Sequence, residues 1–349
     1  MVKIYGTNEA STGAFLLDRG TIVHQLPDGH TFTFSGHNVI FGVTEILVGW
    51  EEDKPPHRLL EVQAEENSII KPVPVANLKK LIKLFHIGFN INQQLARLLV
   101  EINRRLEHML SSQSEKERQS QKCARNYAII VEHIHEAFNR LRFPVLKELY
   151  EEFSNSLTYP FGQALRRVLT KAVIDLAGGA FDSLLREYPQ DAVICRQGDS
   201  GDTLFILRSG MLGIYLGELE KPVATITTSG EVIGEMSLLL NEPRTATMRA
   251  ETPVKLSAIA RSDLQQVVEG KADFFIQLGV TLSKRIVQAL SLLKHLIAAA
   301  PDPEEQVMSF HDPHRDAFRT LERRIKEMLH EHDFPIMKTL QEELRNIKS

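Results

Sequence analysis

The chain has few of the residues that define disulfide-rich or thiolate-based proteins. Its 349 residues include two cysteines, Cys123 and Cys195, which excludes a disulfide framework and a thiolate-rich zinc site. No segment approaches the roughly 20 consecutive apolar residues of a membrane span. The N-terminus lacks the charged start and apolar core of a signal peptide. These absences predict a cytoplasmic protein that does not cross a membrane.

Charge of one sign is not in excess. The net charge of −4 gives no overall attraction to nucleic acid or to an acidic membrane. The sequence also lacks the GxxxxGK[ST] phosphate loop, the G-x-S-x-G nucleophile elbow and the catalytic-loop triplet of protein kinases. We therefore expect a globular protein of two or more domains that is not an enzyme.

Apolar periodicity divides the chain into alternating β-rich and α-rich blocks. Short β-branched runs between glycines, such as TFTF at 31–34 and NVIF at 38–41, are typical of strands joined by turns. Apolar residues spaced three and four apart are typical of helices. The predicted parts are a β-barrel at 1–75, a helical connector at 76–180, a β-barrel with a C-terminal helix at 181–297, and a polar helical tail at 298–349.

Several local features refine this division. In the connector, Pro144 interrupts a helical stripe, and the polar residues 111–122 predict either a linker or a solvated helix. A short helix is expected at 181–187. The stripe from Phe275 to Leu296 predicts either a short coiled-coil seam or a helix that packs on its own barrel. Pro335 divides the tail.

The two β-rich blocks share residues in the same order. The segment GAFLLDRGTIVH at 13–24 aligns with TLFILRSGMLGI at 203–214. The shared landmarks are Ile4, Phe15, Gly20, Gly42, Arg58 and Ala64 in the first block, and Ile194, Phe205, Gly210, Gly234, Arg244 and Ala250 in the second. Small insertions and deletions in turns account for the changes in spacing, so an internal repeat is the better explanation.

The second block carries the residues of a ribose-phosphate site. Gly234 precedes a short apolar run, and free amides at such a start attract an anion that the glycine allows to come close. Ten residues later Arg244 offers a planar fork of donors among small neighbours. The Glu235 carboxylate can accept hydrogen bonds from a sugar hydroxyl. A turn and a surface ion pair would explain either half alone, but not their spacing and order.

Residues 188–268 resemble a complete cyclic-nucleotide-binding domain, the module of the catabolite activator protein, the protein kinase A regulatory subunit and cyclic-nucleotide-gated channels. The family's pattern stands here as Gly234-Glu235, Leu238 and Pro243-Arg244-Thr245-Ala246-Thr247. The resemblance implies an eight-stranded jelly-roll-like barrel with helices at both ends. It also implies that Glu235 holds the ribose 2′-hydroxyl and Arg244 holds the cyclic phosphate. The implied ligand-binding residues are Gly234, Glu235, Met236, Ser237, Arg244, Thr245 and Ala246.

The choice of base depends on Thr245 and on the C-terminal helix. In the family, a hydroxyl residue directly after the arginine suits cyclic GMP, but it also occurs in cyclic AMP receptors. The resemblance therefore leaves both ligands open, with a slight preference for cyclic AMP. The C-terminal helix usually covers the base, so the resemblance places a lid near Phe274 to Ser283.

The first block departs from the pattern. Arg58 keeps the phosphate-binding position, but Gly-Glu has become Gly42-Val43, and Glu45 lies nearby out of register. The segment that leads to the arginine is longer and carries acidic residues, Trp50 and two prolines. These changes predict a degenerate barrel that has lost its ligand and serves as a scaffold or partner surface; a divergent ligand is the alternative.

Together these features predict a mixed α and β (α+β) protein with two jelly-roll-like barrels joined and flanked by helices. We expect a non-enzymatic cyclic AMP or cyclic GMP receptor that passes ligand occupancy through its helices to a protein partner or a second copy. We expect no cofactor, no metal and no membrane partner. The histidines at 311–314 and 330–333 are either metal ligands or part of a solvated tail.

Three other function classes fit less well. A transcription regulator like the catabolite activator protein needs a winged helix-turn-helix after the long helix, and the residues beyond 300 show no recognition helix, so DNA binding is not expected. A kinase regulatory subunit would carry Arg-Arg-x-Ser/Ala before the barrels, and Arg104-Arg105 and Arg166-Arg167 lack that continuation. A structural protein with two ligand-free barrels is the third alternative.

Overall fold

The chain forms two compact units, and each unit combines two separate segments. The computed structural model describes residues 1–50, 56–165, 173–174, 181–217, 222, 224–271, 273–298, 312–331 and 342. Unit 1 consists of Met1–Ile102 with Leu169–Val287, and unit 2 of Asn103–Val168 with Gln288–Ser349. Helices and strands are both abundant, so the mixed class is confirmed. The bounds of these two units do not coincide with those of the four predicted parts, at 1–75, 76–180, 181–297 and 298–349. The boundaries of the four parts therefore stay a prediction.

Unit 1 begins with a five-stranded antiparallel sheet. Its strands are β1 (Val2–Tyr5), β2 (Gly13–Gln25), β3 (Thr31–Phe41), β4 (Glu61–Ala64) and β5 (Ile69–Pro74). They lie in the order β1-β4-β2-β3, and β5 also pairs with β2. Leu17, Ile22 and Val62 form the fully buried centre of its core. The runs at 31–34 and 38–41, predicted as separate strands, belong to the single strand β3, because both pair with β2 in one register that continues through Gly36 opposite Gly20.

The second β region of unit 1 consists of two four-stranded antiparallel sheets. Its strands are β6 (Leu185–Tyr188), β7 (Val193–Cys195), β8 (Thr203–Ser209), β9 (Leu212–Tyr215), β10 (Ala224–Ile226), β11 (Val232–Ile233), β12 (Thr247–Ala250) and β13 (Val254–Ala260). Their orders are β10-β9-β12-β7 and β11-β8-β13-β6. The apolar core between them includes Phe205, Leu207 and Leu256.

The helix expected at 181–187 is wrong. Only Asp182–Leu184 forms a single 3₁₀ turn, η1, and Leu185 begins strand β6. Strand β6 pairs with β13, where Glu187 lies opposite Lys255 and forms an ion pair with it. Cross-strand hydrogen bonds along the sheet edge outweigh a helical preference that extends over only two turns.

The two β regions pair residues that the sequence comparison aligns. In the first region the cross-strand pairs are Phe15–Phe41, Leu17–Ile70 and Ile22–Ala64. The corresponding pairs in the second region are, in the same order, Phe205–Ile233, Leu207–Leu256 and Leu212–Ala250. They differ in continuity, since β2 is one long strand where β8 and β9 are separate. Gly20 and Gly210 both adopt a positive φ at the corresponding place. The pairings define open sheets, so two closed barrels stay a prediction.

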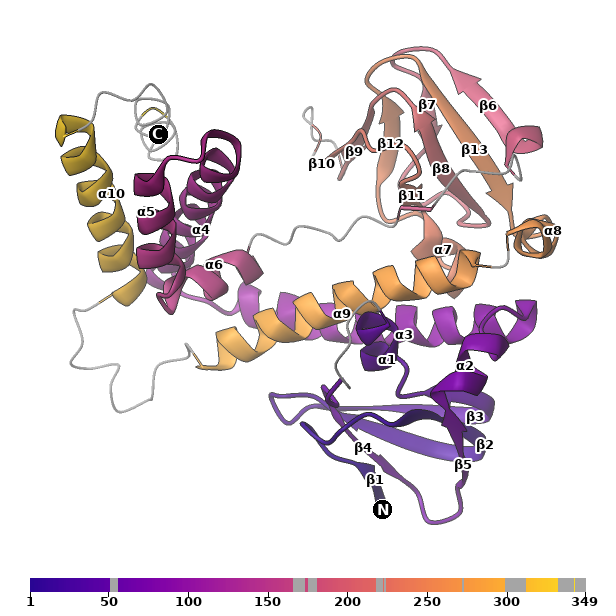
Figure 1. The fold of residues 1–349 in the computed structure, drawn as a ribbon. Coiled ribbons are helices and arrows are strands. Elements are labelled where there is room, and N and C mark those ends of the chain that lie inside the picture. The colour runs from indigo at the N-terminus through magenta and orange to yellow at the C-terminus, as the bar shows by residue number, and fades with distance from the viewer. Residues whose placement is uncertain are drawn as a thin grey trace. The chain divides into compact units, whose positions relative to one another are not determined.

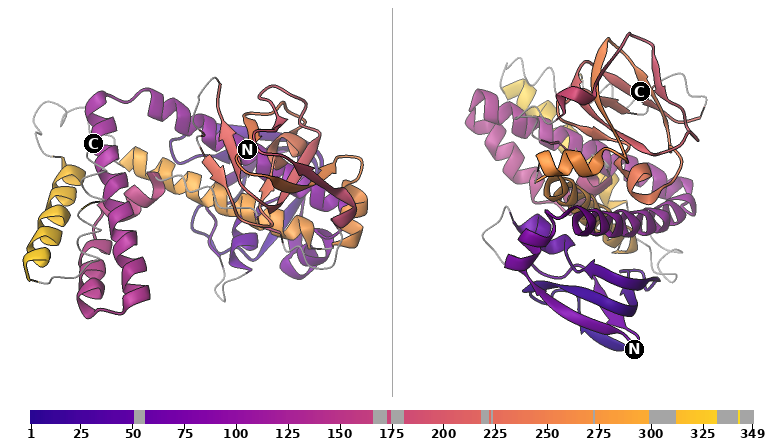
Figure 2. Two further views of the ribbon diagram at one scale, coloured as in Figure 1. Left: turned by 90° about the horizontal axis from the view of Figure 1, so that it is seen from above. Right: turned by 90° about the vertical axis from the view of Figure 1, so that its right-hand side faces the viewer.

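Unit 1 also contains a layer of helices. Its helices are α1 (Thr44–Gly49), α2 (Val75–Leu81), the greater part of α3 (Phe85–Ser111), α7 (Glu235–Leu240), α8 (Leu264–Gly270) and the greater part of α9 (Phe274–Ala298). Within this unit, α3 and α9 lie between the five-stranded sheet and the second β region (Figure 1, Figure 2). The apolar residues Ile91, Leu95 and Ile102 recur at helical spacing along α3 and are buried.

Unit 2 is helical. It contains α4 (Glu115–Leu141), α5 (Pro144–Ser154), α6 (Thr158–Leu165) and α10 (Pro313–Glu331). The capping box of Ser114 and Glu117 starts α4, so most of the polar stretch at 111–122 is a helix rather than a linker. Pro144 occupies the first position of α5, as its fixed φ favours.

The tail is not simply a solvated polar segment. On α10, Leu321 and Ile325 are fully buried and share a core with Ile130 and Ile134 of α4. His314 is hydrogen-bonded to Thr158 Oγ1 at 3.0 Å. Among the described residues, no group of three potential metal ligands occurs; His311, His332 and Asp333 lie outside them.

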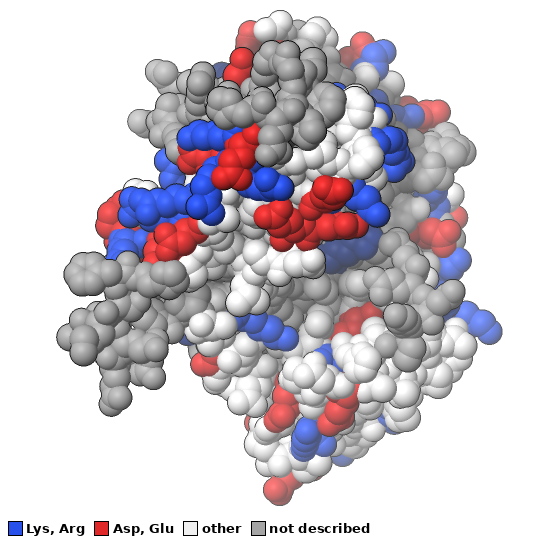
Figure 3. Space-filling model, turned by 60° about the vertical axis from the view of Figure 1, so that its left-hand side comes forward, with Lys and Arg blue, Asp and Glu red and all other residues white. Residues whose placement is uncertain are grey.

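The surface carries charges of both signs. On the face drawn in Figure 3, lysine and arginine side chains lie interspersed with aspartate and glutamate. Within the described part of the chain, no helix has the length and apolar character to cross a membrane.

Candidate functional site

A sharp turn between β11 and α7 brings the predicted site residues together. Gly234 adopts a φ of +80°, which strongly favours glycine, and α7 begins at Glu235 directly after it. A Cβ atom on Gly234 would lie 2.3 Å from Nη1 of Arg244. The glycine is therefore required both for the turn and for the close approach of the arginine.

Arg244 is held from several sides. Its side chain is buried, Nη1 donates to the Gly234 carbonyl oxygen at 3.2 Å, and Nη2 donates to the Thr203 carbonyl oxygen. The guanidinium carbon lies 5.5 Å from the centre of the Phe205 ring. Its Nε is buried without a hydrogen-bond partner. Among the described residues, no carboxylate is within ion-pair distance of Arg244.

The backbone of Arg244 is fixed by the turn before β8. Its amide donates to the Asp199 carbonyl oxygen at 2.8 Å, and its own carbonyl oxygen accepts from the Gly198 amide at 2.9 Å. At Gly201 a Cβ atom would meet the Glu242 carbonyl oxygen at 2.2 Å. This turn therefore packs tightly against the chain that leads into Arg244 and fixes where the guanidinium lies.

Glu235 forms an ion pair that the sequence analysis missed. Its carboxylate is buried, and Oε1 accepts a hydrogen bond from Nη1 of Arg285 on α9. The only signal in the sequence is a charged residue beside the apolar stripe positions Leu282 and Ile286. The residue predicted to hold the sugar is thus tied to the C-terminal helix.

The other predicted site residues take different environments. Ser237 is buried and donates to the Pro243 carbonyl oxygen at 3.3 Å, which links the two ends of the segment. Met236 and Ala246 are half-buried, and Thr245 is exposed. In the predicted lid, the Phe275 ring lies 6.0 Å from that of Phe85 on α3. Their roles in ligand binding stay predictions.

The carboxyl end of α7 is also held by residues that were not predicted. Gln93 of α3 donates to the Leu239 carbonyl oxygen at 2.9 Å, and Nη2 of Arg261 donates to the Leu238 carbonyl oxygen. Gln93 precedes the motif by more than a hundred residues. No local sequence pattern connects them.

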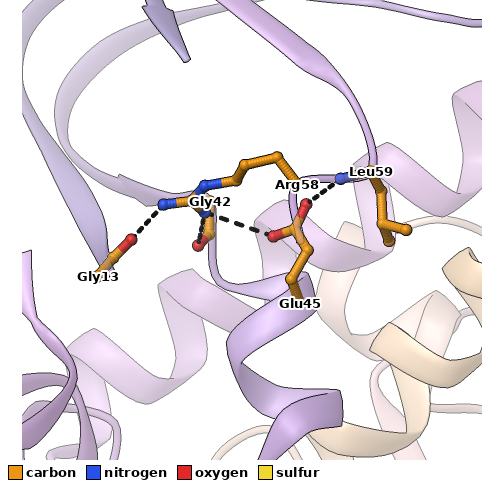
Figure 4. A network of polar contacts seen from close by, with 5 residues as sticks. All are labelled: Gly13, Gly42, Glu45, Arg58 and Leu59. Atoms are coloured by element: carbon orange, nitrogen blue, oxygen red, sulfur yellow. Dashed lines mark hydrogen bonds and ion pairs between the residues drawn. The ribbon is translucent and has the colours of Figure 1, made fainter. Parts of the chain in front are cut away.

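Arg58 forms the corresponding network in the first β region (Figure 4). Nη1 donates to the Gly42 carbonyl oxygen at 2.7 Å, and Nη2 donates to the Gly13 carbonyl oxygen. In addition, Nη1 lies 3.5 Å from Oε2 of Glu45, and both side chains are buried. Oε1 of Glu45 accepts from the Leu59 amide at 2.9 Å. Glu45, noted from the sequence as out of register, therefore pairs with the arginine.

Tyr5 closes the network around Arg58. Its ring centre lies 4.3 Å from the guanidinium carbon, close enough for a cation–π interaction. Burial raises the pKa of the Tyr5 hydroxyl, the Glu45 charge raises it further, and Arg58 opposes the shift. Tyr5 thus stays protonated and fills one side of the arginine.

Residues 185–271 match the cyclic nucleotide-binding domain family. The chain therefore contains a cyclic nucleotide-binding domain, and the predicted resemblance of this segment is confirmed. The match covers about a quarter of the chain and includes Glu235 and Arg244. It does not extend to the first β region.

Curated relatives align over the same part of the chain. A cAMP-dependent protein kinase regulatory subunit of Emericella nidulans is 28% identical over 122 residues, which cover 35% of this chain and 27% of the relative. A type II regulatory subunit of Drosophila melanogaster is 38% identical over 80 residues, which cover 23% and 20%. Human cGMP-dependent protein kinase 2 is 33% identical over 112 residues, which cover 32% and 14%. The alignments span about a quarter or less of these relatives.

Among solved structures, cAMP-bound PfPKA-R aligns with 76% of this chain and 70% of its own, at 15% identity and a TM-score of 0.26. A cGMP-bound form of the EAL enzyme Bd1971 aligns with 35% of this chain and 32% of its own, at 31% identity and a TM-score of 0.24.

Proposed function

We propose that this protein is a receptor for a cyclic mononucleotide, cyclic AMP or cyclic GMP, and has no catalytic activity of its own. The observation that carries the proposal is the state of Arg244. It is a buried cation with an unpartnered Nε, and no described carboxylate balances its charge. A buried charge without a counter-charge is costly. A cyclic phosphate would supply both the negative charge and the acceptor oxygens for a guanidinium fork.

Glu235 supplies the second half of the proposed site. Its carboxylate lies at the start of α7, directly after the glycine whose carbonyl oxygen accepts from Arg244. In the proposal it accepts a hydrogen bond from the sugar hydroxyl while Arg285 holds its other side. The amides of Met236, Ser237 and Thr245 complete the phosphate contacts, and Gly234 and Ala246 leave room for them.

We further propose that the first β region is a degenerate copy of the same domain. Three strand pairings of equivalent register support this, as does the shared pattern of Arg58 and Arg244 bonds to glycine carbonyl oxygens. In this copy Glu45 already provides the counter-charge that a phosphate would bring. The proposal therefore assigns one nucleotide site to the chain.

The proposed role is regulatory, with ligand occupancy passed to a protein partner through the helices. The Arg285–Glu235 pair supports this, because it links the sugar-binding residue to α9. The matched relatives include regulatory subunits of cAMP-dependent protein kinase and a cGMP-dependent protein kinase. A ligand that changes Glu235 would thereby bias the position of α9.

Calorimetric titration of nucleotide-free protein with cyclic AMP and cyclic GMP tests the function. We expect saturable binding of at least one of them at one site per chain. AMP and GMP serve as matched controls, since they keep base and ribose but lack the cyclic phosphate, and they should bind far more weakly. Absence of binding by both cyclic nucleotides would refute the receptor function.

A further inference from the structure

The carboxyl end of α7 depends on a helix outside the nucleotide-binding domain. A helix leaves its last four carbonyl oxygens without partners inside the helix, and in the six-residue α7 these make up most of the helix. The backbone amides of Asn241 and Glu242 donate to the Ser237 carbonyl oxygen, and the Arg261 side chain donates to the Leu238 carbonyl oxygen. The Leu239 oxygen is bound by Gln93 of α3, which precedes the matched segment 185–271.

The same turn of α3 also holds the start of α9. Asn92, next to Gln93, is fully buried and donates to the Phe275 carbonyl oxygen at 3.0 Å and to the Gly88 oxygen at 2.9 Å. A Cβ atom on Gly88 would lie 2.5 Å from the Phe275 ring, so the two helices are in direct contact. Adjacent residues of α3 therefore bond to both helices that carry the ion pair of the site.

The N-terminal sheet reaches α9 as well. A Cβ atom on Gly279 would lie 3.1 Å from Cδ1 of Leu47 on α1 and 3.4 Å from the Asn92 side chain. At its other end α7 is bonded to α9 through Glu235 and Arg285. The helices α3, α7 and α9 thus form a closed ring of contacts: α3 to α7, α7 to α9, and α9 to α3.

We propose that α3 sets the nucleotide affinity of the site, with Gln93 as the positioning residue that fixes the carboxyl end of α7. This inference rests on the proposed function. Gln93 does not touch the ligand. It holds the short helix whose first residue is Glu235 and whose preceding glycine carbonyl oxygen bonds to Arg244. Through α3, a segment outside the matched domain thus contributes to the nucleotide affinity.

Two substitutions of Gln93 separate the hydrogen bond from the packing. Gln93→Met keeps the length of the side chain but removes the donor, and we expect about fivefold weaker cyclic nucleotide binding by calorimetry, or about 1 kcal/mol. Gln93→Lys keeps a donor, and a cation is favourable at a helix carboxyl end, so we expect affinity within about twofold of wild type. Gln93 is half-buried, so part of its side chain lies at the surface.

The control is Arg97→Met, an exposed position one turn further along α3, which should leave affinity unchanged. Unchanged affinity in Gln93→Met, or equal losses in Gln93→Met and Gln93→Lys, would overturn the assignment.

Hydrogen exchange of the ligand-free protein provides a readout that does not require nucleotide binding. We expect faster exchange of the amides at the carboxyl end of α7 in Gln93→Met, and wild-type exchange in Gln93→Lys. If wild-type protein binds neither nucleotide, the receptor function is refuted. In that case faster exchange in Gln93→Met would still support the role of α3 in holding α7, and unchanged exchange would refute it.

Discussion

Arg58 and Arg244 occupy corresponding places in the two β regions, and they differ in the charge beside them. Each bonds to the carbonyl oxygen of a glycine with positive φ and to the carbonyl oxygen at the start of a long strand. Arg58 has the buried carboxylate of Glu45 at 3.5 Å. Arg244 has no such partner among the described residues. An arginine bound to these two carbonyl oxygens therefore either has its charge balanced by a carboxylate of its own chain, as Arg58 has, or can bind an anion, as we propose for Arg244.

The residues around the two arginines also differ, and the differences leave less space for a ligand beside Arg58 than beside Arg244. Tyr5 lies over Arg58 and fills the space beside it. Tyr5 follows Ile4, which aligns with Ile194 in the second region. The residue after Ile194 is the much smaller Cys195, which lies near Arg244. Val43 stands where Glu235 stands in the second region. In the proposal that the first region is a degenerate copy, Tyr5 thus fills the place of the ligand, Glu45 supplies the counter-charge, and no residue replaces the sugar-binding carboxylate.

The largest expected effect is on Arg244. Arg244→Met removes the proposed phosphate-binding fork, and we expect cyclic nucleotide affinity to fall at least about 100-fold, or about 2.7 kcal/mol. Arg244→Lys keeps the charge without the fork and should recover only part of this loss. Calorimetry measures the affinity, and circular dichroism checks that the variants are folded.

The matched control is Arg58 in the other region. Arg58→Met should leave the affinity within about twofold, because the proposed site does not include it. A comparable loss of affinity in Arg58→Met would show that both arginines bind ligand, and the distinction between the regions would then fail.

The second effect concerns the stability of the first region. Glu45→Gln leaves Arg58 without a counter-charge while the amide oxygen can still accept from the Leu59 amide. We expect a loss of about 2 kcal/mol in the free energy of unfolding, which is less than the roughly 3 to 5 kcal/mol for breaking a buried pair, because Arg58 keeps its carbonyl partners. Urea denaturation measures it, and nucleotide affinity should not change.

Glu9→Gln, in the same first β region, is the control for Glu45→Gln. Glu9 pairs with Lys3 in an exposed ion pair and should contribute nothing measurable. If Glu45→Gln is no less stable than wild type, Arg58 is not charge-balanced by Glu45, and the contrast with Arg244 loses its basis.

A third difference is a buried titratable group in the first region. His24 packs against Phe32 with ring centres 4.8 Å apart, and burial lowers its pKa from 6.5 to about 3. The folded protein thus holds neutral His24, while the unfolded chain binds a proton below pH 6.5. Stability is therefore full above pH 6.5 and is lost progressively as the pH falls toward 3.

We expect His24 to contribute about 1 kcal/mol to the loss of stability between pH 7 and pH 5.5. His24→Phe should flatten this part of the pH profile in urea denaturation, and His30→Phe, at an exposed position, should not. An unchanged profile in His24→Phe would mean that His24 is protonated or solvated in the folded protein.

Local patterns were sufficient to predict the second domain and its motif. The Gly-Glu and Pro-Arg-x-Ala-Thr spacing identified the turn at Gly234, and most apolar positions of the helical stripes in α3 and α4 are buried, although Leu141 at the end of α4 is exposed. The errors arose where local preference competes with distant contacts. Residues 185–188 are a strand because they pair with β13, and α10 packs in a helical core because its few apolar residues share one face.

Residues outside the motif could not be assigned from the sequence. Arg285 on α9, Gln93 on α3 and Arg261 in the turn after β13 bond to α7, and the residues next to them in the sequence do not indicate this. Glu45 was visible near Arg58, but whether a carboxylate three residues after a glycine reaches an arginine depends on how α1 turns. Such partners follow from tertiary packing and not from spacing.

The smallest expected effect concerns the choice between cyclic AMP and cyclic GMP. Only the second region has a proposed nucleotide site, so here the two regions are not compared. Thr245 is exposed next to Arg244, so its hydroxyl is free to meet a ligand. Thr245→Ala should weaken cyclic GMP binding about threefold relative to cyclic AMP, the range of one solvent-exposed hydrogen bond, and Thr245→Ser should restore the ratio. The paired titrations distinguish two roles: equal losses for both nucleotides would assign the hydroxyl to the phosphate, which the two ligands share, instead of the base.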